Sequence, residues 1–362
     1  MPDFVKKIYR KCRKVSRELR ARVAYAAAHE IVEIPYEEAL ARLQALAPRP
    51  VSTALTHNHI GEILYDLAII VPAYNAEKWI RECVDSILSQ ETDYSFLAVF
   101  VDDGSRDQTG AILDGYLPNK RMRVVHQENR GYSGARNAAL KELHSEYIMF
   151  VDSDDRLLPG AVQTLLRKAK ETDADIVEGN GYRFDETGRL GKVKADDSDH
   201  WGAPWLKVIR SKLFERLEFP EGYLYEDTII NGLIYPLAEK AVTVPDEIYA
   251  YRIHPDSITQ RHDDNLRRVD SFWILLLLEE LRKELGLDDR EEWNRLVLNQ
   301  IWFTQRRCVR LPEDVQKLLF ACEAGYVSRF RITTAPSRFQ KILSALMLKD
   351  YGKYTAACRD CA

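Results

Sequence analysis

Four short apolar runs recur at nearly constant spacing across the middle of the chain. They begin at Leu67, Phe96, Met122 and Tyr147, which lie 29, 26 and 25 residues apart. Each run has the length of a strand, and each interval leaves room for one helix with its loops. Near-continuous apolar strands joined by helices predict an α/β fold in which a mostly parallel sheet is covered by helices on both faces.

The composition is that of a globular protein from a reducing compartment. Of the 362 residues, 46% are hydrophobic, which is too high a fraction for a disordered chain. The longest apolar run, Phe272–Leu278, has seven residues, whereas a membrane span needs about 18. Six cysteines are too few for a disulfide scaffold, and the basic N-terminus lacks the apolar stretch of a secretory signal. We therefore expect a cytoplasmic protein.

Positive charge is concentrated at the two ends. The net charge of the chain is −4, which excludes a nucleic-acid binder that acts through bulk positive charge. Residues 1–22 nevertheless contain nine Lys or Arg against two acids, and residues 326–362 contain seven against two. Both ends also carry apolar residues at helical spacing, namely Phe4, Ile8, Cys12, Val15, Leu19 and Val23, and Phe339, Ile342, Leu343, Leu346 and Met347. Such helices suit an anionic membrane surface; packing on the acidic remainder of the chain is the other interpretation.

Polar side chains follow the predicted strands at the sheet edge where ligands of open parallel sheets bind. They are Tyr74 and Asn75, after Pro72 at the end of the first strand, Asp102 and Asp103 after the second, and Asp152 and Asp154 after the fourth. We expect Asn75 and Ser105 to cap the helices that follow them. Acid clusters after two of the strands predict a binding site at this edge.

Asp152 and Asp154 form a D-x-D sequence directly after a buried strand. In an extended segment, residues i and i+2 point the same way, so the two carboxylates would repel each other without a cation. Mg²⁺ and Mn²⁺ prefer oxygen ligands and accept phosphate oxygens beside carboxylates. We predict a divalent metal at Asp154 and Asp152, with a solvated acidic turn as the alternative.

Two further charged segments precede predicted helices. Arg136 follows Gly131 in a first turn, where it can pair with a phosphate or with an acid of the same chain. Glu226 and Asp227 precede another apolar helix. They are either acids that the helix dipole favours at a helix N-terminus or a general base in the site. The sequence contains neither G-x-G-x-x-G nor a Walker loop, which argues against a dinucleotide-binding or P-loop protein.

Together these segments resemble the family 2 glycosyltransferases, which have the GT-A fold. The resemblance spans Ile69 to about Thr259 and is carried by Ile69–Asn75, Val101–Thr109, Asn129–Asn137, Phe150–Asp155 and Tyr225–Asp227. It implies that a sugar moves, with inversion, from a nucleotide-sugar to a hydroxyl group. By family frequency the donor is a UDP-sugar, and the cofactor is Mn²⁺ or Mg²⁺.

The resemblance also implies residue roles. Asp227 is the catalytic base, and Asp154 with Asp152 holds the metal. The donor nucleotide is contacted by Pro72, Tyr74, Asn75, Asp102, Asp103, Arg136, Asp152 and Lys207. Trp205, Glu226 and Arg252 are expected on the acceptor side. The segment Trp205-Leu206-Lys207 resembles capsule and exopolysaccharide enzymes, in which Asn often stands in place of Leu206.

The resemblance thus implies a glycan or lipid-linked acceptor in surface polysaccharide synthesis, and an enzyme at the inner face of the cell membrane. We expect three parts: a basic helix and connector in residues 1–66, a GT-A catalytic domain in 67–260, and a helical region with a basic amphipathic end in 261–362.

Two other functions use similar residues. A sugar nucleotidyltransferase needs a glycine-rich loop with Lys or Arg after the first strand, and Val71–Asn75 does not supply one. A non-catalytic module that binds a nucleotide-sugar or glycan needs no general base. The combination of Asp103, Asp154 and Asp227 therefore favours an enzyme.

Overall fold

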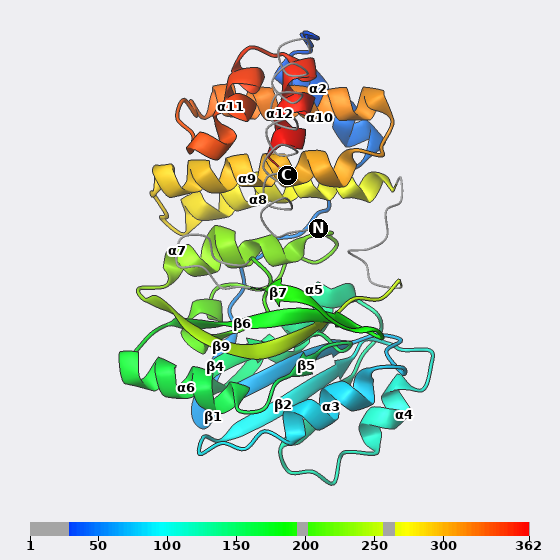
Figure 1. Cartoon of the computed structure of the whole chain (residues 1–362), viewed down its shortest axis with the longest axis vertical. Helices are drawn as coiled ribbons and strands as arrows, with labels where there is room; N and C mark the ends of the chain where they lie inside the picture. The colour runs from blue at the N-terminus through cyan, green and yellow to red at the C-terminus, as the bar shows by residue number, and fades with distance from the viewer. Residues whose placement is uncertain (1–28, 194–201, 256–264, 362) are drawn as a thin grey trace, which may run out of the picture. The chain divides into compact units, whose positions relative to one another are not determined.

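The computed structural model describes residues 29–193, 202–255 and 265–361 (Figure 1). The predicted basic helix of residues 1–22 lies outside these residues. The described residues form two compact units. The sheet unit comprises those between Pro50 and Arg261 and between Leu277 and Asp288, and the helical unit comprises the rest.

The sheet unit is built on one sheet, which has nine strands among the described residues. In spatial order these are β3 (Met122–His126), β2 (Phe96–Asp102), β1 (His59–Ala73), β4 (Glu142–Phe150), β8 (Lys207–Arg210), β6 (Ile176–Asp185), β9 (Ala241–Arg252) and β5 (Arg156–Leu157), with β7 (Gly188–Val193) paired to β6. Neighbours among β3, β2, β1 and β4 are parallel, whereas β8 is antiparallel to both β4 and β6. The four predicted strands are confirmed as the parallel half, and the other half is mixed.

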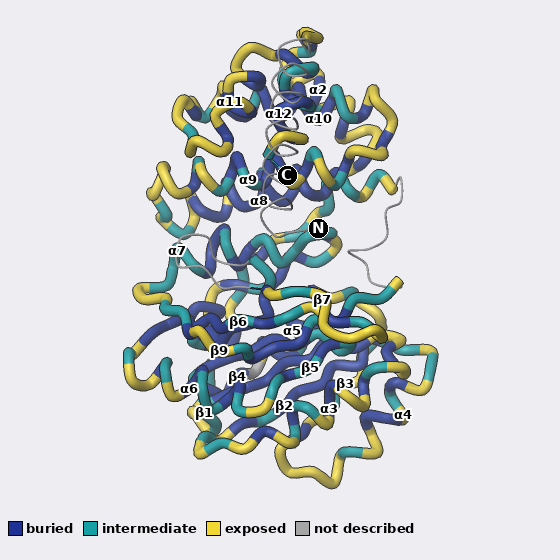
Figure 2. Tube along the Cα trace, in the orientation of Figure 1, coloured by how far each residue is buried: buried dark blue, intermediate teal, exposed yellow. Residues whose placement is uncertain are grey.

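Burial of the apolar runs explains why these strands form. The last seven residues of β1, Leu67–Ala73, are all buried, and Leu97 alone in β2 is not. Helices α3 (Ile80–Leu88), α4 (Thr109–Asp114), α5 (Gly131–Leu140) and α6 (Ala161–Thr172) pack against the strands (Figure 1). Figure 2 shows the central strands buried and many connecting loops exposed. Each fully buried Val, Leu, Ile or Phe side chain contributes roughly 1.5–3 kcal/mol.

The loops after β1 and β2 are bonded to each other rather than to the helices that follow. Oδ1 of Asn75 accepts a hydrogen bond from Arg106 N at 2.8 Å, and Asn75 N donates to Ser105 Oγ at 3.0 Å. Helix α3 begins at Ile80, and neither α3 nor α4 has a side-chain cap. The prediction that Asn75 and Ser105 cap these helices is therefore wrong, because both side chains serve to join the two loops.

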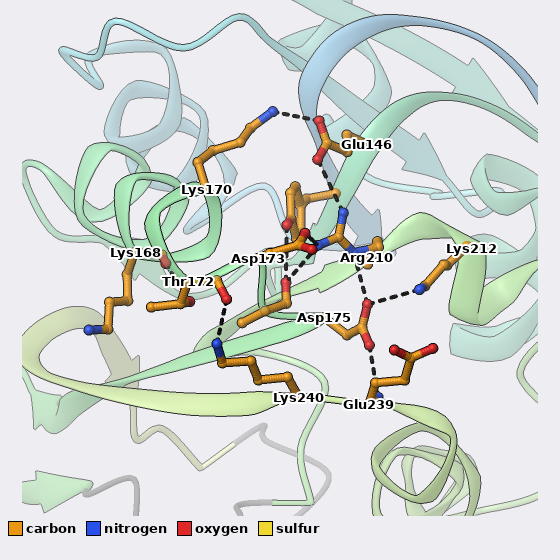
Figure 3. A network of polar contacts seen from close by, with 12 residues as sticks. Glu146, Lys168, Lys170, Thr172, Asp173, Asp175, Arg210, Lys212, Glu239 and Lys240 are labelled. Atoms are coloured by element: carbon orange, nitrogen blue, oxygen red, sulfur yellow. Dashed lines mark hydrogen bonds and ion pairs between the residues drawn. The ribbon is translucent and has the colours of Figure 1, made fainter.

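A network of ion pairs lies at the end of the mixed half of the sheet that is away from the D-x-D sequence (Figure 3). Arg210, the last residue of β8, reaches Asp175 Oδ1 at 2.8 Å, Asp173 Oδ1 at 2.6 Å and Glu146 Oε1 at 3.3 Å. Lys170 of α6 also contacts Glu146. The network thus bonds β4, β8, α6 and the start of β6 at the edge away from the D-x-D sequence.

The helical unit contains α2 (Tyr36–Leu46), the first half of α8 (Asp270–Glu284), α9 (Arg290–Cys308), α10 (Glu313–Arg329), α11 (Gln340–Met347) and α12 (Tyr351–Asp360). Helix α2 packs on α10 at Gly325, where a Cβ would lie 2.3 Å from Tyr36 Cδ2. The remaining short elements of the chain are η1 (Ser211–Phe214), η2 (Glu226–Thr228), η3 (Ile230–Ile234), α7 (Tyr235–Leu237), η5 (Leu266–Val269) and η6 (Ser337–Phe339).

The basic amphipathic helix near the C-terminus is packed inside the helical unit. Phe339, Ile342, Leu343 and Leu346 are buried, and α11 packs against α10 and α12. Most of this apolar face is therefore covered by protein, whereas Met347 at its end is exposed. Within the described residues, no helix combines the length and apolarity needed to cross a bilayer.

A buried carboxyl in α10 makes the stability of the helical unit depend on pH. Glu323 is 1% exposed, and Tyr354 Oη donates to its Oε2 at 2.7 Å. Burial raises the pKa of Glu323 from 4.5 to about 8, against the lowering effect of Tyr354. The folded state then binds one more proton than the unfolded state between these two values, so stability falls as pH rises through that window.

We predict that Glu323→Gln removes this loss, because Gln stays neutral. Between pH 5 and 9 the unfolding free energy of the unaltered protein should fall more steeply than that of the variant, by up to about 1.4 kcal/mol per pH unit. Thermal or urea unfolding across this range is the measurement. Equal pH slopes would show that Glu323 ionises at its ordinary pKa.

Candidate active site

The candidate site lies at the carboxyl ends of β1, β2 and β4, as the sequence predicted. Ala73 pairs with Asp102, and Ile70 pairs with Phe150, so the three strands end at one edge. Pro72 is buried in β1, whereas Tyr74 beyond it is 44% exposed. The parallel register thus brings the three polar strand ends together.

Asp102 and Asp103 are buried and shape the loop after β2. Asp102 accepts from Ser105 N and contacts His126 Nδ1 at 2.9 Å, and these bonds hold the start of the loop. Oδ1 of Asp103 accepts from Gln127 Nε2 and from Arg130 N at 2.6 and 2.8 Å. Both bonds that this carboxylate accepts from described residues end on Oδ1, which leaves Oδ2 for a ligand.

The segment Asn129–Asn137 anchors the loop that leads to η2. Ser133 Oγ donates to Pro220 O at 2.9 Å. Asn137 Nδ2 donates to Phe219 O, and Asn137 Oδ1 accepts from Phe219 N, both at 2.8 Å. The chain then turns through Tyr225, whose φ of 79° is unusual for a residue with a side chain. This anchored turn presents Glu226 and Asp227 to the site.

Arg136 joins the D-x-D turn to the η2 segment. Its guanidinium contacts Glu226 Oε1 at 2.7 Å and Asp152 Oδ1 at 3.4 Å. Burial opposes its charge, but the attraction of Glu226 and Asp152 outweighs this and raises the pKa of Arg136. The intramolecular ion pair, one of the two pairings open from the sequence, is therefore present, and a phosphate contact of Arg136 stays a prediction. Its Nε has no hydrogen-bond partner among the described residues.

The site has a surplus of negative charge. Burial raises the pKa of Asp152 to about 6; Arg136 opposes this shift, and the carboxylates of Asp154, Glu226 and Asp227 add to it. Asp227 is half-buried, and its charge acts on Asp152, on Arg136 and on Lys207. The predicted base is therefore in the electrostatic field of the predicted metal ligands.

Asp154 is held by residues at and beyond the end of β9. Oδ2 of Asp154 is 2.8 Å from His254 Nε2, and its carbonyl accepts from Arg252 Nε at 2.7 Å. Arg252 is buried, and its guanidinium also contacts Glu82 and lies over the ring of Trp79. The structure thus places Arg252 behind the D-x-D turn, and an acceptor contact for it stays a prediction. His254 was missed from the sequence, where its position two residues after Tyr251-Arg252 was the available signal.

Trp205 and Lys207 are buried rather than exposed to the site. Trp205 is 7% exposed. Its ring stacks on those of Tyr249 and Tyr251, with ring centroids 5.0 and 5.1 Å apart. Lys207 Nζ is 3.4 Å from Glu178 Oε1, and burial lowers its pKa against the pull of Glu178. Their predicted substrate contacts remain predictions.

Between Trp205 and Lys207, Leu206 has a φ of 72°. Asn adopts this left-handed conformation more readily than Leu. The backbone conformation thus gives a physical reason for the Asn that similar enzymes often carry at this position.

The residues present suit a divalent cation completed by a substrate. Among the described residues, no three His, Cys, Asp or Glu side chains form a group able to hold a metal ion. Asp152 and Asp154 nevertheless offer hard oxygen ligands. The pKa of Asp152 is raised first by burial and further by the neighbouring carboxylates, and a cation would relieve the repulsion among these carboxylates. A phosphate-bearing substrate would supply the missing ligands.

Sequence comparison identifies relatives that share the sheet unit. The profile of Glycosyl transferase family 2 matches residues 68–223. Glycosyltransferase GlyG of Streptococcus pneumoniae is 33% identical over 224 residues, which are 55% of this chain and 74% of GlyG. Glycosyltransferase GlyA of the same bacterium is 34% identical over 219 residues, 54% of this chain. The chain spans 31% of the length of GlyA.

Among solved structures, S. aureus TarS 1-349 has a TM-score of 0.59 at 22% identity, covering 82% of this chain and 90% of that one. TarS 1-349 has also been solved in complex with UDP-GlcNAc. This likeness confirms the expected GT-A fold. Given the coverage of GlyG, the matched profile and the ordered strand-end motifs, the chain belongs to glycosyl transferase family 2.

Proposed function

We propose that the protein is an inverting glycosyltransferase that moves a sugar from a nucleotide-sugar to a hydroxyl group of a glycan or lipid-linked glycan. The observation that carries the proposal is the ion-pair bridge of Arg136 to Asp152 and Glu226. It joins the turn suited to the donor phosphates to the segment that carries Asp227. A transferase needs both in one site: a cationic centre for the departing nucleotide and a base for the acceptor.

We place the uridine nucleotide of the proposed donor at the loops after β1 and β2. Tyr74 and Asn75 are exposed there beside the buried Pro72, Asp102 and Asp103. We assign the uracil ring of the nucleotide to this surface, where Oδ2 of Asp103 can accept a hydrogen bond from it. The choice of a UDP-sugar is supported by TarS, whose fold is similar and which has been solved with UDP-GlcNAc.

We assign the metal to Asp154 and Asp152, with His254 orienting Asp154. The metal, when bound, stabilises the negative charge that the diphosphate acquires as it leaves. Asp227 accepts the proton of the acceptor hydroxyl, and Arg136 keeps Glu226 and Asp152 in fixed places beside it. A single displacement assisted by one base gives inversion at the sugar. The departing diphosphate needs no acid, unlike the leaving group of a glycosidase.

One test of the proposed function concerns the metal. Asp154→Asn keeps the shape of the side chain but removes its charge, so Mn²⁺-dependent UDP binding should weaken. Affinity should fall by at least roughly 10–100-fold, which is the typical effect of removing a residue that orients a metal ligand without binding the metal itself. Calorimetry with UDP in Mn²⁺ and in EDTA measures it, with the exposed Asp246→Asn as the matched control. Full turnover of the unaltered enzyme in EDTA would contradict a metal-dependent reaction.

The next prediction concerns the base. In Asp227→Asn, transfer should fall by roughly 10²–10⁴-fold because the amide cannot take the hydroxyl proton. UDP binding should change little. The donor would come from a screen of nucleotide-sugars, UDP-GlcNAc included, for release of free nucleotide with and without Mn²⁺. Normal transfer by Asp227→Asn together with loss in Glu226→Gln would reassign the base to Glu226.

We further propose that residues 1–22 attach the enzyme to the inner face of the cell membrane, where a lipid-linked acceptor for surface polysaccharide would lie. Their nine basic residues each contribute about 1 kcal/mol near an anionic surface. The proposal is limited to this end, because Phe339, Ile342, Leu343 and Leu346 of the C-terminal pattern are buried.

Co-sedimentation with anionic and neutral vesicles tests the attachment. The full chain should bind anionic vesicles, more weakly at high salt, and a chain lacking residues 1–25 should not. Replacing Lys6, Lys7, Lys11 and Lys14 by Gln should weaken binding while keeping the apolar residues. Equal binding by the truncated chain at low and high salt would contradict the proposal.

A further inference from the structure

The hydroxyl group of Tyr249 is hydrogen-bonded to both Asp152 and Asp155 in the D-x-D turn. It donates to Asp155 Oδ2 at 2.7 Å and accepts from Asp152 N at 3.1 Å. The direction of both bonds is fixed, because an amide nitrogen can only donate. Tyr249 and Asp155 are both 0% exposed, so neither touches substrate or solvent. Burial of such a polar pair is costly unless its bonds are complete.

Asp155 completes the connection to β9. Its Oδ1 accepts from Arg252 N at 2.7 Å, so one carboxylate joins the Tyr249 side chain to the Arg252 main chain. Arg252 and His254 in turn hold the carbonyl and carboxylate of Asp154. All three aspartates of the turn are therefore bonded to residues 249–254. This matters because the turn lies beyond β4, which ends at Phe150.

The ring of Tyr249 is itself fixed by packing. Trp205 stacks on it with the two rings 14° from parallel. A phenylalanine would keep this stacking and the apolar fit, and would lose the hydroxyl alone. The hydroxyl is therefore not needed to fill the core. Its position between Asp152 N and Asp155 points to a role in directing the turn.

We propose that Tyr249, acting through Asp155, is a positioning residue that fixes the orientation of the Asp152 and Asp154 carboxylates for the metal–diphosphate complex. The inference rests on the proposed function and deepens it. Two carboxylates that repel each other separate unless the backbone holds them, and metal ligands keep their affinity when outer partners orient them. Removal of the hydroxyl should therefore lower affinity for metal-bound nucleotide without changing contacts to the nucleotide itself.

Tyr249→Phe is the test, and Tyr147→Phe is its matched control. Tyr147 is also 0% exposed in the same sheet, and its hydroxyl donates to Ala174 O, away from the site. Calorimetric titration with UDP at varied Mn²⁺ is the measurement, with EDTA as reference. We expect Tyr249→Phe to weaken Mn²⁺-dependent UDP binding by roughly 10–100-fold. UDP binding in EDTA should be unchanged, and Tyr147→Phe should match the unaltered protein.

Asp155→Asn extends the test, because it keeps the shape but loses one acceptor oxygen. It should act in the same direction, and the double variant should lose less than the sum of the two single losses, since both residues serve one connection. Equal Mn²⁺ dependence in Tyr249→Phe and Tyr147→Phe would overturn this proposal alone. If the unaltered protein binds UDP without any Mn²⁺ dependence, both this proposal and the proposed metal are wrong.

Discussion

The candidate site depends on the ion pairs that the buried guanidinium of Arg136 makes. Its pairs with Glu226 and Asp152 connect α5 to η2 and to the turn after β4. Loss of one partner from a buried ion pair typically costs about 3–5 kcal/mol, because the other charge is left without compensation. The segments that carry the proposed base and the proposed metal ligands are therefore held together by charge. Both segments are short, because the D-x-D turn lies beyond the end of β4 and Asp227 lies in the three-residue helix η2.

The site receives support from two directions. On one side, the start of α5 fixes the loop that leads to η2 through Ser133 and Asn137. On the other, β9 and the residues after it hold the aspartates of the D-x-D turn. Trp205 reinforces this second support by stacking on Tyr249. Arg136, Trp205 and Arg252, which the sequence suggested as substrate contacts, thus bond to or pack against other side chains of the site. Contacts of this kind can fix the orientation of flexible acidic side chains.

Two clusters of charged residues at opposite edges of the sheet differ in their balance. At the edge drawn in Figure 3, Lys170, Arg210 and Lys212 face Glu146, Asp173 and Asp175, so acids and bases compensate each other. At the candidate site, Asp152, Asp154, Glu226 and Asp227 outnumber the central Arg136, and the pKa of Asp152 rises to about 6. A balanced network stabilises the fold, whereas a surplus of one sign calls for a ligand of the other. The surplus marks the edge where function is expected.

The sequence by itself determined the parallel half of the sheet and the edge at which the candidate site lies. Apolar runs at βαβ spacing permit few other folds, and the residues that follow parallel strands must meet at one edge. The tertiary structure decided which polar groups pair. It placed Asn75 and Ser105 between loops, Arg136 against Glu226, and Trp205 in the core. It also brought His254 to Asp154, 100 residues away in the chain. These partners come from the loops after β1 and β2, from η2 and from the residues just beyond β9, and their approach to one another depends on packing between distant segments of the chain.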